Sequence, residues 1–157
     1  MHALFLALAV YTAAVLPAET GPEALAFTHF PDRLHAFVWR NWNLAPVERM
    51  AAVVDAKPDQ ILALGRAMGL PDPPAITEEQ LARTYITLIR ANWHLLPYEQ
   101  LTTLLDCTES ELAFTLREDD FLFIKLGSLK PACAPLEYKT PDAAAIAREA
   151  EIAAVVR

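Results

Sequence analysis

The chain has 157 residues, of which 54% are hydrophobic and 21% are charged, so it can fill a folded core and is not disordered as a whole. Its 20 acidic and 13 basic residues give a net charge of -7, which argues against nucleic acid as a partner because phosphate binding needs clustered Lys and Arg. The two cysteines are too few for a disulfide scaffold.

The N-terminus predicts a signal peptide over residues 1–26. Residues 3–16 form an uncharged apolar run that is too short to span a membrane comfortably. Ala24-Leu25-Ala26 offers the small-residue pattern of a cleavage site, and Leu16-Pro17-Ala18 offers a poorer one. We therefore expect export to the periplasm or the exterior, with no membrane span after processing. Because no Lys or Arg precedes the run, a buried first helix in a cytoplasmic protein is the alternative.

The first unit, residues 27–70, predicts three helices. Phe30-Pro31-Asp32 opens the first helix, Pro46 stands at the first position of the second, and Pro58 starts the third. Gly69 ends the third helix in the manner of a left-handed cap. A proline-rich linker, residues 71–76, then separates this unit from the next.

The second unit, residues 77–120, predicts the same plan with clearer helix starts. Thr77-Glu78-Glu79-Gln80 and Thr108-Glu109-Ser110-Glu111 are both capping boxes, in which the Thr and the last residue satisfy each other's backbone amides. The first unit has Lys57 where Thr108 stands, so it lacks this cap and instead has a proline as helix starter.

The two units match each other at a fixed offset of 51 positions. Such a match indicates one supersecondary unit used twice. The identical pairs are Asn41/Asn92, Trp42/Trp93, Leu44/Leu95, Pro46/Pro97, Glu48/Glu99, Asp55/Asp106 and Arg66/Arg117. We predict an all-α fold built from a tandem pair of trihelical helix-turn-helix-like units, with a short extended segment and a C-terminal helix. The residues expected to form the structural core are Trp42, Trp93, Leu44, Leu95, Pro46 and Pro97.

After the second unit the pattern changes. Residues 121–126, FLFIKL, predict a strand or an extended segment, and residues 121–139 as a whole predict an extended arm. A last helix is expected over residues 140–157, with Thr140 as its cap. It stops at Arg157 without a terminating pattern, which suggests that the natural chain continues or that a partner covers this end.

The densest polar cluster is the candidate binding site. It comprises Arg117, Asp119 and Asp120, with Glu118 beside them and Lys125 nearby. A solvated helix end is the competing interpretation, because no Gly-rich calcium loop follows and adjacent acids cannot all point into one site. The sequence contains no zinc-protease, serine-hydrolase or phosphate-loop pattern, so we assign no catalytic residue, metal or cofactor.

Two further questions stay open in the sequence. Cys107 and Cys133 can pair if the chain is exported, or they are two unpaired thiols. The trihelical layout also raises DNA binding, in which the third helix of each unit would enter the major groove. Acidic residues outnumber basic ones on this helix of the second unit, and the same helix of the first unit carries one of each, Asp59 and Arg66, so neither helix has the basic surface that a phosphate-lined groove needs.

Residues 30–138 carry the segments FVWRNWNLAPVERM, IRANWHLLPYEQL and ELAFTLREDDFLFIKLGSLKP. These segments resemble an N-terminal region of large, often exported bacterial proteins that are similar to glycoside-hydrolase-like, carbohydrate-active enzymes. The resemblance covers about two thirds of the chain. It implies a helical accessory module that precedes a sugar-processing domain. The catalytic part would lie beyond Arg157, so the resemblance transfers no catalytic residue.

The leading hypothesis is therefore a non-catalytic, all-helical module of an exported carbohydrate-active bacterial system. Its partner would be a protein domain or a partner chain, for example a carbohydrate-active domain. A helix-turn-helix DNA-binding regulator is the first alternative. A small enzyme that uses the acid cluster of residues 118–120 is the second.

Overall fold

The computed structural model describes residues 15–119 and 121–156, and all regular secondary structure in these ranges is helical. The fold is therefore all-α, as predicted. Most of the apolar run of residues 3–16, the candidate ligand Asp120 and the terminal Arg157 lie outside the described residues. The helices are α1 (Arg33–Asn41), α2 (Val47–Val53), α3 (Pro58–Ala67), α4 (Glu78–Asn92), α5 (Tyr98–Leu105), α6 (Glu109–Glu118), α7 (Leu122–Lys125) and α8 (Ala143–Val156).

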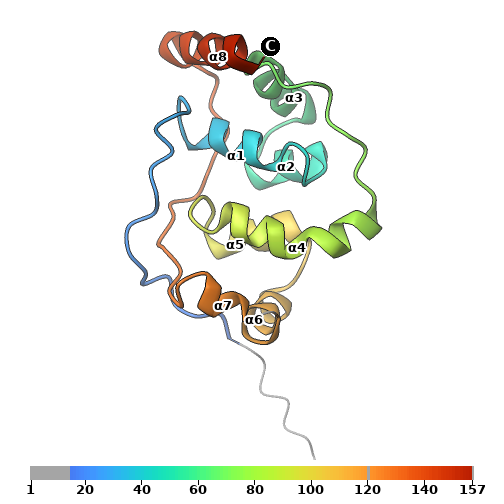
Figure 1. Ribbon diagram of the computed structural model, residues 1–157, viewed down its shortest axis with the longest axis vertical. Coiled ribbons are helices and arrows are strands. Elements are labelled where there is room, and N and C mark those ends of the chain that lie inside the picture. The colour runs from blue at the N-terminus through green and yellow to red at the C-terminus, as the bar shows by residue number, and fades with distance from the viewer. Residues whose placement is uncertain (1–14, 120, 157) are drawn as a thin grey trace, which may run out of the picture.

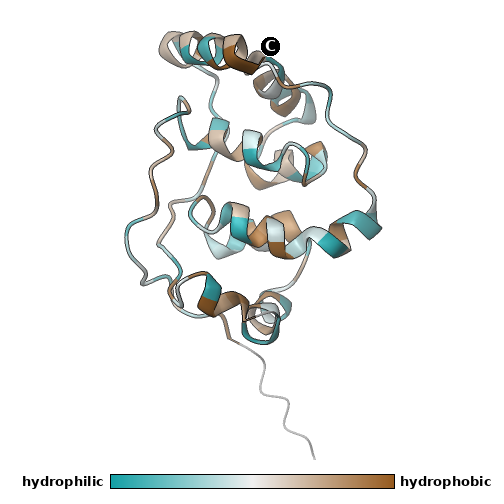
Figure 2. Cartoon of the chain, viewed as in Figure 1, coloured by the Kyte–Doolittle hydropathy of each residue, from teal (hydrophilic) through white to brown (hydrophobic). Residues whose placement is uncertain are grey.

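The helices are stacked in layers (Figure 1). From top to bottom these are α8 with α3, then α1 with α2, then α4 with α5, and last α6 with α7. Contacts join α1 to α4 and α2 to α5, so the middle of the stack is the boundary between the two predicted units. Most helices carry both apolar and polar residues (Figure 2), as expected where one face packs against the next layer.

Local capping interactions begin the helices at the predicted places. The hydroxyl oxygen of Thr77 accepts a hydrogen bond from the Gln80 amide at 3.2 Å, and Thr108 does the same for the Glu111 amide. Pro58 is the first residue of α3, as expected, whereas α2 begins one residue after Pro46. These starts depend on contacts within four residues, which is why the sequence predicts them well.

A shared aspartate ends the second helix of each unit. Asp55 and Asp106 occupy matching positions and have φ angles of 52° and 55°, in the left-handed region. Asp tolerates this conformation better than most residues with a side chain, so it can reverse the chain after α2 and α5. This requirement accounts for the identity of the two positions.

A buried pair of asparagines joins the two units. Asn41 donates from Nδ2 to the Asn92 side-chain oxygen at 2.8 Å, and Asn92 donates back at 2.7 Å. Each amide also donates to the carbonyl four residues earlier in its own helix, that of Phe37 or Leu88. Both side chains are buried, and these bonds satisfy their donors within the core.

The extended segment expected at residues 121–126 is instead the short helix α7. Leu122 is buried, and α7 packs against α6. A strand needs a neighbour to pair its backbone groups, and no strand is present in residues 15–119 or 121–156 to supply one. A helical turn satisfies these groups internally. The extended arm therefore begins only after α7, and it runs to Asp142.

The last helix also begins later than expected. The carboxylate of Asp142, not Thr140, accepts a hydrogen bond from the Ala145 amide at 2.8 Å, and α8 starts at Ala143. The segment 15–32 and the arm 127–142 run along the left edge of the helix stack in Figure 1. The Gly21 amide donates to the Lys130 carbonyl at 2.9 Å, which ties the two extended segments together.

The residues expected in the core differ in burial. Trp42, Trp93 and Leu95 are buried, whereas Leu44, Pro46 and Pro97 are half-buried. Within the part of the chain that the structure describes, no helix is both long enough and apolar enough to cross a bilayer.

Candidate functional site

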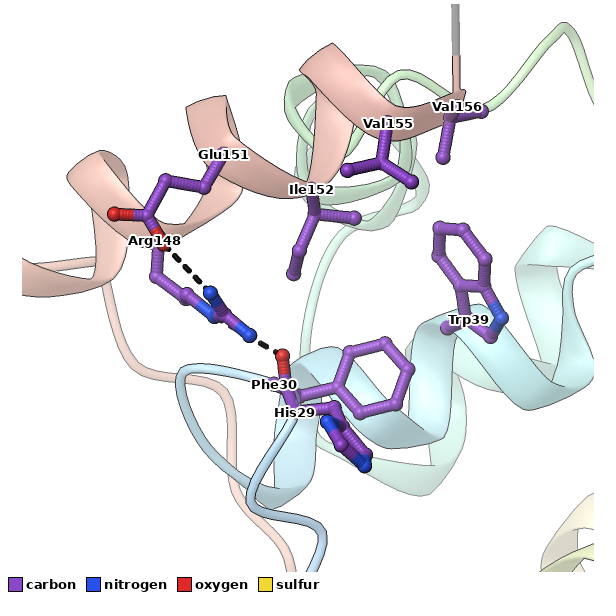
Figure 3. A pocket seen from close by; sticks show the side chains of 8 residues that line it. All are labelled: His29, Phe30, Trp39, Arg148, Glu151, Ile152, Val155 and Val156. Carbon is purple, nitrogen blue, oxygen red and sulfur yellow. Dashed lines mark hydrogen bonds and ion pairs between the residues drawn. The ribbon is translucent and has the colours of Figure 1, made fainter.

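An open groove with a mostly apolar lining lies between α1 and α8, hereafter the α1–α8 groove (Figure 3). It has a volume of about 400 Å³. One wall comes from the residues before α1 and from α1 itself, and the other comes from the C-terminal half of α8. The lining residues are His29, Phe30, Trp39, Arg148, Glu151, Ile152, Val155 and Val156.

Aromatic rings form the α1 wall of the groove. The ring centroids of Phe30 and Trp39 are 5.7 Å apart and their planes are tilted by 55°. Such tilted pairs are a favourable aromatic geometry, so the two rings form one surface. Ile152 is half-buried across the groove, and Val155 is 87% exposed. An apolar side chain with that exposure beside two rings is available for contact with another molecule.

Polar groups lie at one end of the groove. Arg148 donates from Nε to the His29 carbonyl oxygen at 3.1 Å and pairs with the Glu151 carboxylate at 2.6 Å. These contacts link α8 to the loop before α1 and leave the apolar lining without a charged group at its centre (Figure 3). The groove offers little that would orient a polar substrate.

A buried histidine holds α8 in place beside α1. His35 lies 2.7 Å from Asp32 through Nδ1 and 2.8 Å from Glu149 of α8 through Nε2. Burial by itself lowers the pKa of His35, but its hydrogen bonds and charge interactions with the two carboxylates outweigh this and raise the pKa above 6.5. The charged imidazolium then donates a hydrogen bond to each carboxylate.

The same contacts lower the pKa of Asp32. Burial raises the pKa of this carboxyl, but the hydrogen bonds and charge of His35 outweigh burial and bring the pKa below 3.8. Asp32 also caps α1 by accepting from the His35 amide at 2.9 Å. The position of one groove wall therefore depends on an ionisable trio.

The predicted acid cluster has the following contacts. Arg117 pairs with Glu118 at 2.6 Å, and the Asp119 carboxylate accepts a hydrogen bond from the Tyr85 hydroxyl of α4 at 2.9 Å. Lys125 lies on α7, and Asp120 falls outside the described residues. A binding role for these residues stays a prediction. The described residues contain no group of three or more His, Cys, Asp or Glu placed to hold a metal.

A second unusual site surrounds Lys130, which is fully buried. Its ammonium group donates to the Leu96 carbonyl at 2.7 Å and the Pro131 carbonyl at 3.1 Å, and it lies 3.3 Å from the Glu19 carboxylate. It also lies 5.4 Å and 5.5 Å from the ring centroids of Trp93 and Tyr98. Carbonyls, aromatic faces and one carboxylate therefore replace the water around this charge.

The two cysteines are both free thiols, so they do not form the disulfide that export would permit. Cys133 is buried, and its sulfur lies 3.5 Å from the Lys130 ammonium. Burial, with help from Glu111 and Asp106, raises the pKa of Cys107 to about 11, so this thiol stays protonated and unreactive at neutral pH.

α3 and α6, the third helix of each unit and the candidate DNA-binding helices, are each partly covered by another helix. α8 packs on α3, and a Cβ placed on Gly69 would lie 2.9 Å from the Ala153 Cα, which shows how closely α8 approaches the end of α3. α7 packs on α6 in the other unit. The surface that remains on α6 carries Glu109 and Glu111, both exposed.

Several of these residues were missed by sequence reasoning. Trp39 departs from the repeat, because Arg90 stands at the matching position, and this departure was a usable signal. His35 and Lys130 carry no such signal, since their partners Glu149 and Glu19 lie more than a hundred positions away.

The chain matches no known protein family, and no curated protein or solved structure is significantly similar to it.

Proposed function

We propose that this chain is a non-catalytic helical accessory module of an exported, carbohydrate-active bacterial system, and that it binds a protein partner through the α1–α8 groove. The observation that carries the proposal is the open apolar lining, in which Phe30 and Trp39 face the exposed Val155. The carbohydrate-active context comes from the resemblance of residues 30–138, and export comes from the apolar N-terminus.

The groove favours a helical segment of a partner over a small polar ligand. A groove between two helices suits an amphipathic helix, whose apolar residues at every third or fourth position would lie against the rings. The chain has a net charge of -7, so basic residues on the flanks of that helix would speed its association. The occupant is therefore an amphipathic, basic-flanked helix of the carbohydrate-active domain.

We also propose that the two three-helix units share one origin. The fixed-offset match of residues 41–66 and 92–117 supports this, as do the matching left-handed conformations of Asp55 and Asp106. The duplication would supply a rigid scaffold, and the added helix α8 would supply the binding groove. A helix-turn-helix geometry of each unit would be tested by superimposing both units on each other and on DNA-binding domains.

The binding test uses carbohydrate-active domains encoded next to this chain in the genome, once the neighbouring sequence has identified them. A photo-crosslinking residue at Val155 should link to such a domain, whereas the same residue at Ala154, exposed on α8 but outside the groove lining, should not. Val155→Asp should weaken binding at least about tenfold, since it places a charge in the apolar contact, and Ala154→Asp should leave the dissociation constant unchanged. Equal effects of the two variants, or no binding by any such domain, would overturn the proposal.

Export is tested separately. Cell fractionation should place the chain in the periplasm or the medium, with residues at the N-terminus removed. A chain found in the cytoplasm with Met1 intact would overturn the proposed export. The crosslinking and binding measurements would still test whether a partner binds at the α1–α8 groove. A salt-dependent gel shift with duplex DNA would instead support a helix-turn-helix regulator.

A further inference from the structure

The segment before α1 belongs to the fold. Gly21 donates its amide to the Lys130 carbonyl at 2.9 Å, and the Leu25 amide donates to Nδ1 of His94 at 3.2 Å. The contact at Gly21 is close, because a Cβ there would lie 2.8 Å from the Lys130 carbonyl carbon. Gly21 and Leu25 are therefore hydrogen-bonded to residues much later in the chain.

The most important of these contacts is the one that Glu19 makes with Lys130. The ammonium group is fully buried, and the Glu19 carboxylate lies 3.3 Å from it. A buried charge that loses its counter-charge is among the most destabilising changes in a protein core. A mature chain that lacked Glu19 would keep the buried lysine and lose this carboxylate.

A cleavage after Ala26 conflicts with these contacts. It would remove Glu19, Gly21 and Leu25 together, along with the chain that covers Lys130. The other small-residue pattern, Leu16-Pro17-Ala18, ends immediately before Glu19, and Ala18 is exposed. A cut at that point would remove the apolar run and keep every contact named above.

We propose that export removes the leader by hydrolysis of the peptide bond between Ala18 and Glu19, so that Glu19 is the first residue of the mature chain. Water supplies the oxygen of the new Ala18 carboxylate and a proton of the new Glu19 amine. This inference rests on the proposed export. It also shortens the predicted signal peptide from residues 1–26 to residues 1–18.

The first test is the mass and N-terminal sequence of the exported protein. Both should correspond to a chain that begins at Glu19. An exported, folded chain that begins at Phe27 would overturn this inference while leaving export in place. A cytoplasmic chain that begins at Met1 would overturn both, so the two failures are distinguishable.

A pair of matched variants of the full chain tests the cleavage site itself. Ala18→Leu should block processing and leave a longer precursor, because the peptidase requires a small residue before the cut. Ala26→Leu should be processed like the natural chain. The opposite pattern, in which only Ala26→Leu blocks processing, would overturn the proposal.

A second pair tests why Glu19 must remain. In the exported protein Glu19→Gln should lower the melting temperature by several degrees, since it removes the counter-charge of Lys130. Glu23→Gln changes an exposed carboxylate close by in the same segment and should leave the melting temperature within about one degree. Equal melting temperatures for the two variants would contradict the role given to Glu19.

Discussion

The two three-helix units hold the same tryptophan in different ways. Trp42 lies against Gly65 of α3, where a Cβ would come within 2.2 Å of the indole ring, and its Nε1 donates to the Pro71 carbonyl at 2.8 Å. Leu116 stands at the position that matches Gly65. Trp93 instead contacts Tyr98 and Phe123 edge-on, at centroid distances of 6.0 Å and 6.4 Å.

This difference shows that two similar three-helix arrangements can pack against different segments from elsewhere in the chain. In the first unit a glycine makes room for the indole within the unit, and α8 covers the outside through His35 and Glu149. In the second unit the indole borders elements added from elsewhere in the chain, including α7 and the ammonium group of Lys130. The segments outside the two units therefore make their surroundings different.

The largest expected effect comes from replacing Gly65 of the first unit with leucine, the residue at the matching position of the second unit. Gly65→Leu should destabilise the protein by about 3 kcal/mol, because the buried indole of Trp42 occupies the space that the new side chain needs. Urea denaturation measures the loss. Adding Trp42→Phe should restore part of the stability, and an unchanged midpoint for Gly65→Leu would contradict the packing difference between the units.

The next largest effect concerns the asparagine pair, where the units are alike. Asn41→Leu should cost about 2 kcal/mol, because it removes both hydrogen bonds between the two amides and leaves the buried side-chain oxygen of Asn92 without its donor, and Asn92→Leu should cost a similar amount. The double variant should cost less than the sum of the two, as a double-mutant cycle would show. Asn43→Leu, at an exposed position, is the control and should change stability by less than about 0.5 kcal/mol.

The third prediction concerns the trio that only the first unit has. Because the pKa of His35 is raised, its stabilisation is fully present below pH 6.5 and is lost as the pH rises through the higher pKa of the folded state. Because the pKa of Asp32 is lowered, its share is present above pH 3.8 and is lost as the pH falls through the folded-state pKa. Thermal unfolding between pH 5 and pH 9 should therefore show falling stability on the alkaline side.

A variant isolates this pH dependence. His35→Gln should cost about 1.5 kcal/mol near pH 6, where hydrogen bonds to a charged group are lost, and its alkaline decline should be smaller than that of the natural chain. Hydrogen exchange in α8 should report the loss first, since Glu149 belongs to α8. A decline of the same size in His35→Gln would assign the pH dependence to another group.

The smallest effect concerns helix caps. Thr108 caps α6 through its hydroxyl, whereas Lys57 at the matching start of α3 cannot accept a hydrogen bond with its ammonium group. Thr108→Ala should cost about 1 kcal/mol, and Lys57→Thr should gain on the order of 0.5 kcal/mol by giving the first unit the same cap. A loss of stability in Lys57→Thr would show that Lys57 has another role.

What the sequence predicted well are the features that depend on near neighbours. The capping residues Thr77 and Thr108 and the helix starter Pro58 stand where the structure uses them. The helix α7 was predicted as a strand or an extended segment because apolar, β-branched content alone does not say whether a partner strand exists. The sequence could have marked Trp39 as an unusual position, since Arg90 stands at the matching position of the second unit.

By itself, then, the sequence determined an all-α chain and the places where several of its helices begin, because turns, caps and helix periodicity are set by residues a few positions apart. Only the tertiary structure decided that α8 builds a groove on α1, that His35 lies between Asp32 and Glu149, and that Glu19 meets Lys130. Apart from the local contact between Asp32 and His35, those contacts join residues whose separation along the chain carries no periodic pattern, so they exist only once the helices have packed.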